Sequence, residues 1–185
     1  MNKIFQLLNS IYPLSEELAA YLSKVFEYIE VKKGDYILRP GQVCKYMHFI
    51  DQGLVRCFFY KGEKEICAWF QTESNAVISY ESFYEQVPAT EYIQALEDCK
   101  LYRISHGDLQ YVYANFIYAN IHRAVLTENY YRILWKCFYN VRLTSAKERY
   151  QFFIENFPQW VNRVPKKDVA AFLGITPEHL SRIRV

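Results

Sequence analysis

The most constraining feature of the sequence is a change of hydrophobic pattern between residues 31 and 104, where helical spacing gives way to short strand-like segments. These segments are rich in β-branched and aromatic residues, and several alternate apolar with polar positions: VKKGDYIL, KYMHFI, GLVRCFFY, KEICAWF, EYIQALE and CKLYRI. Gly34, Gly41, Gly53 and Gly62 punctuate the early ones. So many short strands within about 75 residues predict an α+β chain with an antiparallel β-roll of the jelly-roll type.

Helical patterns flank the strand-rich region on both sides. Near the amino terminus Leu14, Leu18 and Leu22 recur at helical spacing, and Ser15 with the acidic residues after it suits a helix start. From Asp108 to Asn140 the chain contains neither glycine nor proline. This second stretch predicts one long helix.

The long predicted helix is apolar on more than one face. One stripe recurs at steps of three and four, with further apolar positions beside it: Ile117, Ile121, Ala124, Glu128, Tyr131, Trp135 and Phe138, flanked by Val125, Ile133, Leu134 and Cys137. Such a helix needs two partners, typically its own domain and a second subunit. The alternative is a core helix of a single chain. We expect dimerisation, because a small roll cannot cover both faces.

The carboxy-terminal part predicts further short helices. Thr144 or Ser145 can cap a helix from Ala146 to Asn156, which Pro158 closes. The stretch KKDVAAFLGITPEHLSRIR then reads as two short helices joined by a glycine-containing turn.

This pair of helices has the signals of a helix-turn-helix. Pro165 opens the first helix and Gly174 ends it, and Thr176 caps the second, with Pro177 at its first position. Small Ala170 and Ala171 let the helices approach closely. A shared apolar core is available: Val169, Leu173, Ile175, Leu180 and Ile183. A helical hairpin with a purely structural role is the alternative.

The polar positions of the second helix are expected to face outward. They are Glu178, His179, Ser181, Arg182 and Arg184. A helix of this kind fits the major groove of double-stranded DNA, where arginine reads guanine and glutamate accepts from cytosine. The capped Thr-Pro-Glu start followed by Ser-Arg favours this DNA-binding interpretation over the structural one.

Charge is unevenly distributed along the 185 residues. Residues 142–185 hold eight Lys/Arg against four Asp/Glu, a net charge of +4, whereas residues 1–141 hold 14 against 16, a net charge of −2. A basic tail on a slightly acidic body suits a polyanionic partner at one end.

Hydrophobicity and cysteine content indicate the cellular location of the protein and the chemistry it can support. No apolar run approaches the roughly 20 residues needed to cross a bilayer, and the amino terminus lacks a signal-peptide pattern, so we expect a cytoplasmic protein without membrane contact. Five cysteines are scattered without a CxxC pair, which is typical of buried free thiols: Cys44, Cys57, Cys67, Cys99 and Cys137. We therefore expect no metal site.

Over nearly its full length the chain resembles the CRP/FNR family of transcription regulators. The resemblance lies in KKGDYILRPGQVCKYMHFIDQGLVRCFFY and in LGITPEHLSRIR, and ERYQFFIENFP is similar to members common in Bacteroidetes-type bacteria. It implies a cyclic-nucleotide-binding-type β-roll, a dimerising helix and a winged helix-turn-helix. It also suggests a small-molecule effector and RNA polymerase as partners. The chain ends at Val185, within the predicted reading helix, so the wing is expected to be missing.

The resemblance assigns base reading to Pro177, Glu178 and Arg182. Because Pro177 stands where the family commonly has a base-contacting arginine, we expect a different operator. The full predicted DNA-binding set is Lys166, Lys167, Thr176, Pro177, Glu178, Ser181, Arg182 and Arg184.

The chain departs from the family at the effector pocket. The family uses a Gly-Glu pair and, about ten residues later, an Arg followed by Ser or Thr, whereas this chain has Ile78-Ser79 and Ala89-Thr90. A guanidinium is what clamps a cyclic phosphate. We therefore expect no binding of cyclic AMP or cyclic GMP, and leave the effector unknown. The candidate effector residues are Ser79, Tyr80, Glu81, Phe83, Ala89 and Thr90.

Two other function classes share part of this sequence pattern. A sensor module whose tail has become a protein-docking helix would share every feature of the sensor half, but would lack DNA affinity with a steep salt dependence. A metal-dependent jelly-roll enzyme needs converging histidines, and His48, His106, His122 and His179 are far apart in sequence. We expect no catalytic residues.

The predicted organisation has three parts. Residues 1–107 form amino-terminal helices and the β-roll sensor, residues 108–141 the dimerisation helix, and residues 142–185 the helix-turn-helix domain.

Overall fold

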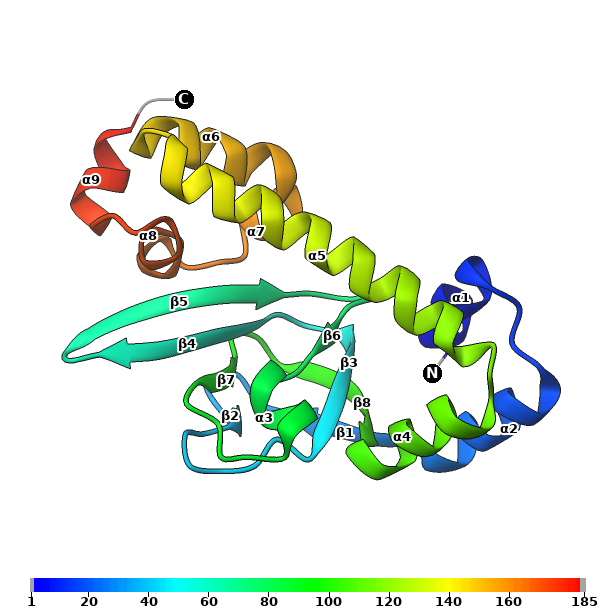
Figure 1. The fold of residues 1–185 in the computed structure, drawn as a ribbon. Coiled ribbons are helices and arrows are strands. Elements are labelled where there is room, and N and C mark those ends of the chain that lie inside the picture. Colours follow the sequence, from blue (N-terminus) through cyan, green and yellow to red (C-terminus); the bar gives the residue numbers. More distant parts are fainter. Residues whose placement is uncertain (1, 184–185) are drawn as a thin grey trace.

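A computed structural model describes residues 2–183 (Figure 1). The chain opens with helices α1 (Asn2–Ile11) and α2 (Glu16–Val25). The strand-rich region follows: β1 (Glu27–Val31), β2 (Tyr36–Leu38), β3 (Tyr46–Gln52), β4 (Val55–Lys61), β5 (Lys64–Gln71), β6 (Ala76–Val77), helix α3 (Tyr80–Glu85), β7 (Tyr92–Ala95) and β8 (Cys99–Ser105). Helices complete the chain: α4 (His106–Asn115), α5 (Ala119–Leu143), α6 (Ala146–Asn156), α7 (Pro158–Val161), α8 (Lys166–Leu173) and α9 (Pro177–Arg182).

The strands form two antiparallel four-stranded sheets, ordered β1-β8-β3-β6 and β2-β7-β4-β5. This confirms the predicted α+β fold with a β-roll. Ile50 and Leu101 of one sheet and Val55 and Ile93 of the other are almost fully buried in the core. Gly53 joins β3 to β4 with a φ of 112°, where an added Cβ would lie 2.6 Å from the sulfur of Cys99. Glycine is therefore required at this turn.

The long predicted helix is broken. Helix α4 ends at Asn115 and α5 begins at Ala119, so the prediction of one helix across residues 108–140 is wrong at residues 116–118. The Asn120 side-chain amide donates to the carbonyl of Tyr113 at 3.0 Å, which satisfies an acceptor at the end of α4. The ring of Phe116 packs against Tyr21 of α2. The break coincides with these side-chain contacts, and no glycine or proline in the sequence indicates it.

The predicted helix starts of the carboxy-terminal part are confirmed. Ser145 caps α6 in a capping box with Glu148. Behind it, an aromatic cluster packs this region onto β5; it consists of Trp69, Phe70, Phe153, Phe157, Trp160 and Phe172. As Figure 1 shows, α8 packs over β5, and α9 projects at the far end from α1 and α2.

Within residues 2–183, no helix combines the length and the hydrophobicity that crossing a lipid bilayer requires.

Candidate nucleic-acid interface and effector cavity

Helices α8 and α9 are joined by a short turn with the predicted signals in place. Gly174 adopts the left-handed conformation, with a φ of 70°, and its N–H bonds to the end of α8. The Thr176 hydroxyl accepts from the backbone N–H of His179 at 3.1 Å, and Pro177 occupies the first turn of α9. Buried Val169, Leu173 and Leu180 hold the two helices together.

The outer face of α9 is exposed to solvent. Exposed side chains of the predicted DNA-binding set are Lys166, Lys167, Thr176, Pro177, Glu178, Ser181 and Arg182. Arg184, the last member of the set, lies outside the described residues. Glu178 and Arg182 are four residues apart and therefore lie on one side of α9.

Local hydrogen bonds already engage two of these side chains. The Ser181 hydroxyl donates to the carbonyl of Pro177 at 2.9 Å. Hydrogen bonds from its own backbone N–H and from Thr176, with the charge of Arg182, hold the pKa of Glu178 below its usual value. Glu178 is therefore ionised at neutral pH, as an acceptor from cytosine would have to be.

Some charges of the carboxy-terminal part face the β-roll instead of solvent. Arg163 pairs with Glu73 at 2.8 Å and with Glu97 at 2.7 Å, and Asp168 is buried against Arg56 at 2.6 Å. The net charge of +4 for residues 142–185 thus includes Arg163, whose charge is already paired with carboxylates of the roll. Arg142, Lys147, Lys166, Lys167 and Arg182 are the exposed basic residues of this part within the described range.

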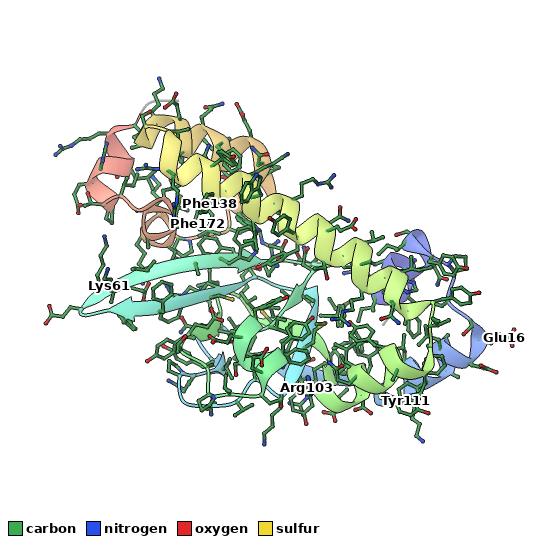
Figure 2. The ribbon with its side chains drawn as sticks, viewed as in Figure 1. Glu16, Lys61, Arg103, Tyr111, Phe138 and Phe172 are labelled. Carbon is green, nitrogen blue, oxygen red and sulfur yellow. The ribbon has the colours of Figure 1, made fainter. Side chains whose placement is uncertain are left out.

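Helix α5 exposes a row of aromatic side chains, here called the α5 aromatic stripe: Tyr131, Trp135, Phe138 and Tyr139 (Phe138 is labelled in Figure 2). Their rings stack on one another, Tyr131 on Trp135 and Trp135 on Phe138. Trp135 and Phe138 leave 48% and 45% of their surface exposed. An exposed apolar row of this size is typical of a protein–protein interface.

The predicted effector residues lie in and after α3, and the chain's own atoms close much of this segment. Ser79, Phe83 and Ala89 are buried, while Tyr80, Glu81 and Thr90 are exposed. The ring of Phe83 packs against His106, and the backbone of Ala89 bonds to Gly41 and Gln42. Of the six residues, Tyr80 is the one that lines the large cavity described next.

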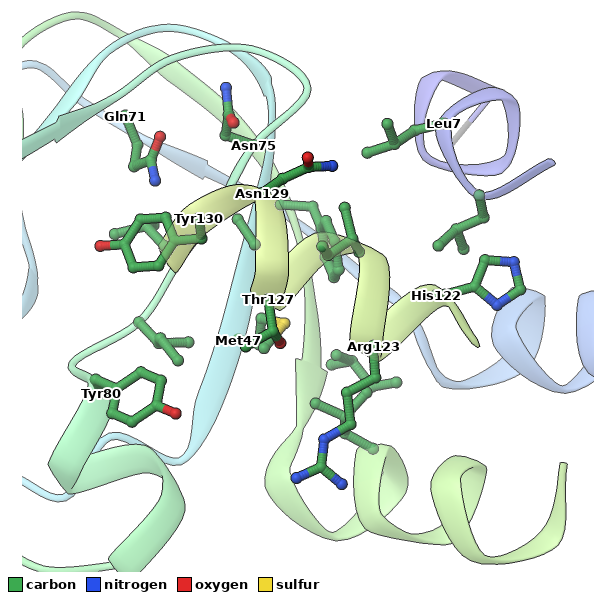
Figure 3. Close-up of a pocket in the computed structure, with 18 of the residues that line it drawn as sticks. Leu7, Met47, Gln71, Asn75, Tyr80, His122, Arg123, Thr127, Asn129 and Tyr130 are labelled. Atoms are coloured by element: carbon green, nitrogen blue, oxygen red, sulfur yellow. The ribbon is translucent and has the colours of Figure 1, made fainter. Parts of the chain in front are cut away.

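A cavity of about 550 Å³ lies between α5, the roll and the amino-terminal helices (Figure 3). Its wall is mostly apolar, with Leu7 from α1, Met47 from β3 and Trp69 from β5 among the lining residues. This volume is within the range of about 300–1,000 Å³ that small-molecule sites occupy. The cavity is therefore the candidate effector site.

Polar side chains are a minority of the cavity lining, and several of them already contact other groups of the protein. His122 bonds to the carbonyl of Tyr12 at 2.9 Å, and the guanidinium of Arg123 lies over the ring of Tyr113. Burial raises the pKa of the Glu91 carboxyl, although a hydrogen bond with Ser79 opposes the shift. Such a lining suits a ligand of low charge.

Sequence reasoning missed most of the cavity wall. The predicted pocket lies beneath residues 78–92, whereas Leu126, Tyr130 and Leu134 of α5 and leucines of α1 and α2 supply much of the lining. The signal was present in the apolar positions flanking the stripe on the long helix, of which Leu134 is one. Which element those positions face depends on the tertiary fold.

The four histidines lie in separate elements. Burial, with the nearby charge of Arg103, lowers the pKa of His48 to about 4. Among the described residues, no three His, Cys, Asp or Glu side chains gather as metal ligands would.

Residues 28–116 match the family model of the cyclic nucleotide-binding domain. Among solved structures, a CooA mutant from Carboxydothermus hydrogenoformans is similar over 97% of this chain and 81% of its own, with 17% identity and a TM-score of 0.72. A protein from Eubacterium rectale assigned to the crp/fnr family of transcriptional regulators matches over 99% of this chain and 86% of its own, with 18% identity and a TM-score of 0.71.

A third structure, the c-di-GMP-responsive global regulator CLP from Xanthomonas campestris, matches over 89% of this chain and 87% of its own, with 13% identity and a TM-score of 0.69. At these identities the likeness establishes the fold. No curated protein matches the sequence.

Proposed function

Since the chain carries a domain of the cyclic nucleotide-binding family within the fold of CRP/FNR-type regulators, we propose that it is a DNA-binding transcription regulator acting in the cytoplasm. The observation that carries the proposal is the pair α8–α9, whose second helix exposes Glu178 and Arg182 on one side, with Lys166 and Lys167 exposed at the start of α8. This combination suits major-groove reading supported by phosphate contacts.

The proposal includes a division of labour along the chain. Residues 1–107 sense an effector, residues 108–141 dimerise, and residues 142–185 bind DNA. The α5 aromatic stripe supports the second role, because a second copy of the chain would cover it. Two reading helices related by a two-fold axis would then address half-sites about 34 Å apart. We propose no catalytic role.

Replacing Arg182 by Ala tests base reading. The substitution is expected to lower the binding free energy for the preferred duplex by about 1–3 kcal/mol and to reduce the base preference at one base pair. Lys167→Ala is the matched control on α8, where an exposed lysine suits a phosphate contact. This variant is expected to weaken binding to all DNA sequences by the same factor. It is also expected to lower the slope of log affinity against log salt concentration by about one.

The measurement selects duplexes from random-sequence DNA with the wild-type protein and then titrates single-base variants against each mutant at several salt concentrations. The assignment of α9 as the reading helix would be contradicted if Arg182→Ala left the affinity ranking of the duplex variants unchanged while Lys167→Ala altered it. Absence of salt-dependent duplex binding by the wild type would favour the protein-docking alternative.

Cyclic AMP and cyclic GMP are expected to bind with a Kd of about 1 mM or weaker, which is at most about 4 kcal/mol of binding free energy. The physical reason is that residues 78–91 supply no arginine to a phosphate, and Ala89 stands at the position where the family has one. Isothermal titration calorimetry checks this, with 5′-AMP as the non-cyclic control. A micromolar Kd for either cyclic nucleotide, absent for 5′-AMP, would overturn the proposal of a low-charge effector.

A further inference from the structure

The carboxy-terminal part is held on the β-roll by a buried ion pair. Arg56 of β4 reaches across to α8, where its Nη1 donates to Oδ1 of Asp168 at 2.6 Å. The same nitrogen donates to Glu65 at 2.7 Å, and Nε and Nη2 donate to Gln94 at 3.0 and 2.9 Å. Arg56 of β4, bonded to side chains of β5 and β7, thus links three strands of the roll to the first helix of the helix-turn-helix.

The pair is deeply buried on both sides. The side chains of Arg56 and Asp168 are 7% and 1% exposed, and Oδ2 of Asp168 has no hydrogen-bond partner among the described residues. Burial raises the pKa of Asp168, and the charge of Arg56 opposes this shift. Because desolvation offsets most of the attraction, a pair of this kind adds little net stability but demands one geometry.

A second cluster repeats the arrangement after α7. Arg163 donates to Glu73 at 2.8 and 3.0 Å and to Glu97 at 2.9 and 2.7 Å, and both carboxylates belong to loops of the roll. Burial would raise the pKa of Glu73, but hydrogen bonds from Arg163 and from the N–H of Gly53 lower it to about 2. Fork-like pairing of this type fixes orientation.

The docked arrangement leaves the DNA-facing side of α9 open. Glu178, Ser181 and Arg182 remain exposed while α8 lies on β5. The hairpin β4–β5 also borders the cavity, because Cys57 and Trp69 line it. Trp69 also packs edge-on against Phe172 of α8, so one hairpin contacts both the cavity and the helix-turn-helix.

We propose that the Arg56–Asp168 pair and the Arg163–Glu73/Glu97 cluster together form an interdomain latch, which holds the helix-turn-helix on the β4–β5 hairpin in the orientation that engages two half-sites. This proposal rests on the proposed DNA-binding function. The latch presets the spacing of the two reading helices, which lowers the entropy lost when both half-sites are bound. A change in the hairpin at the cavity then alters DNA affinity by loosening the latch.

The latch is tested first without DNA, by hydrogen exchange on the full chain. Arg163→Gln is expected to raise amide exchange in α8 and β5 about tenfold, while exchange in β3 and β8 stays unchanged. Arg103→Gln is the matched control, because Arg103 has the same 30% side-chain exposure but pairs with Glu27 inside the roll. Equal exchange in α8 for Arg163→Gln and the control would overturn the latch.

Arg56→Gln, Asp168→Asn and the double variant then test the buried pair. Each single variant is expected to raise amide exchange in α8. The double variant is expected to raise it no more than the larger of the two single effects, because both substitutions remove the same interaction. Additive increases would mean that the two residues act separately, against the proposal. If a single variant raises amide exchange throughout the roll, the double variant, which removes both charges of the pair, decides the outcome.

DNA affinity is the second readout, with a duplex enriched from random sequence by the wild type and a truncated duplex that keeps one half-site. Arg163→Gln is expected to lower affinity for the two-half-site duplex about tenfold and to leave the single half-site unchanged. Equal losses on both duplexes, or none, would overturn the positioning role. If the wild type enriches no duplex, the DNA-binding proposal fails, while the exchange data still decide whether the latch exists.

Discussion

Replacing Trp135 and Phe138 together by aspartate is expected to yield a folded monomer whose affinity for a two-half-site duplex is lower by a factor of about 10²–10⁴. Both side chains are about half exposed in the single chain, so their loss leaves the core intact. In a dimer about a two-fold axis the new carboxylates of both copies would be buried against one another. Burial of unpaired charge opposes association strongly.

Light scattering at tens of micromolar protein, followed by titration with the selected duplex, checks the expectation. Lys136→Asp is the control, because it places a carboxylate on an exposed position of α5 that points away from the stripe. It is expected to remain dimeric. A wild-type protein that is monomeric under these conditions would contradict the role proposed for the α5 aromatic stripe.

Phe153→Ala is expected to lower the free energy of unfolding by about 3–5 kcal/mol, the usual range for removing a buried phenylalanine side chain. Phe153 has no exposed surface and packs among Phe157, Trp160 and Phe172, so neighbouring rings cannot easily fill the space. The cluster joins α6, α7 and α8 to β5. DNA affinity should therefore fall together with stability.

Urea unfolding followed by tryptophan fluorescence provides the measurement, since Trp69 and Trp160 lie in the same cluster. Phe153→Leu is the companion variant and should lose clearly less free energy of unfolding than Phe153→Ala, because the loss grows with the volume of the cavity left behind. Equal losses for the two variants would show that ring packing at this position does not determine the stability of the cluster.

Features that depend on a few neighbouring residues could be predicted from the sequence. Ser15, Ser145 and Thr176 each accept a hydrogen bond from a backbone N–H three residues ahead, so the helix starts are encoded locally. Alternation within several strands and the glycines between the early ones predicted the antiparallel β-roll for the same reason. The solvent-facing side of α9 follows from helical spacing and the buried Leu180.

Features that join distant parts of the chain could not be predicted in this way. The break at residues 116–118 depends on Asn120 and on the packing of Phe116 against α2, and the cavity draws its wall from α1, α2, α5 and the roll. The ion pair between Arg56 and Asp168 spans 112 residues of sequence. Local propensity and periodicity thus select the helices, the strands and the solvent-facing side of α9. The partner of each buried charge, the shape of the cavity and the docking of α8 depend on which surfaces meet when the elements pack, because burial and desolvation arise only in the assembled fold.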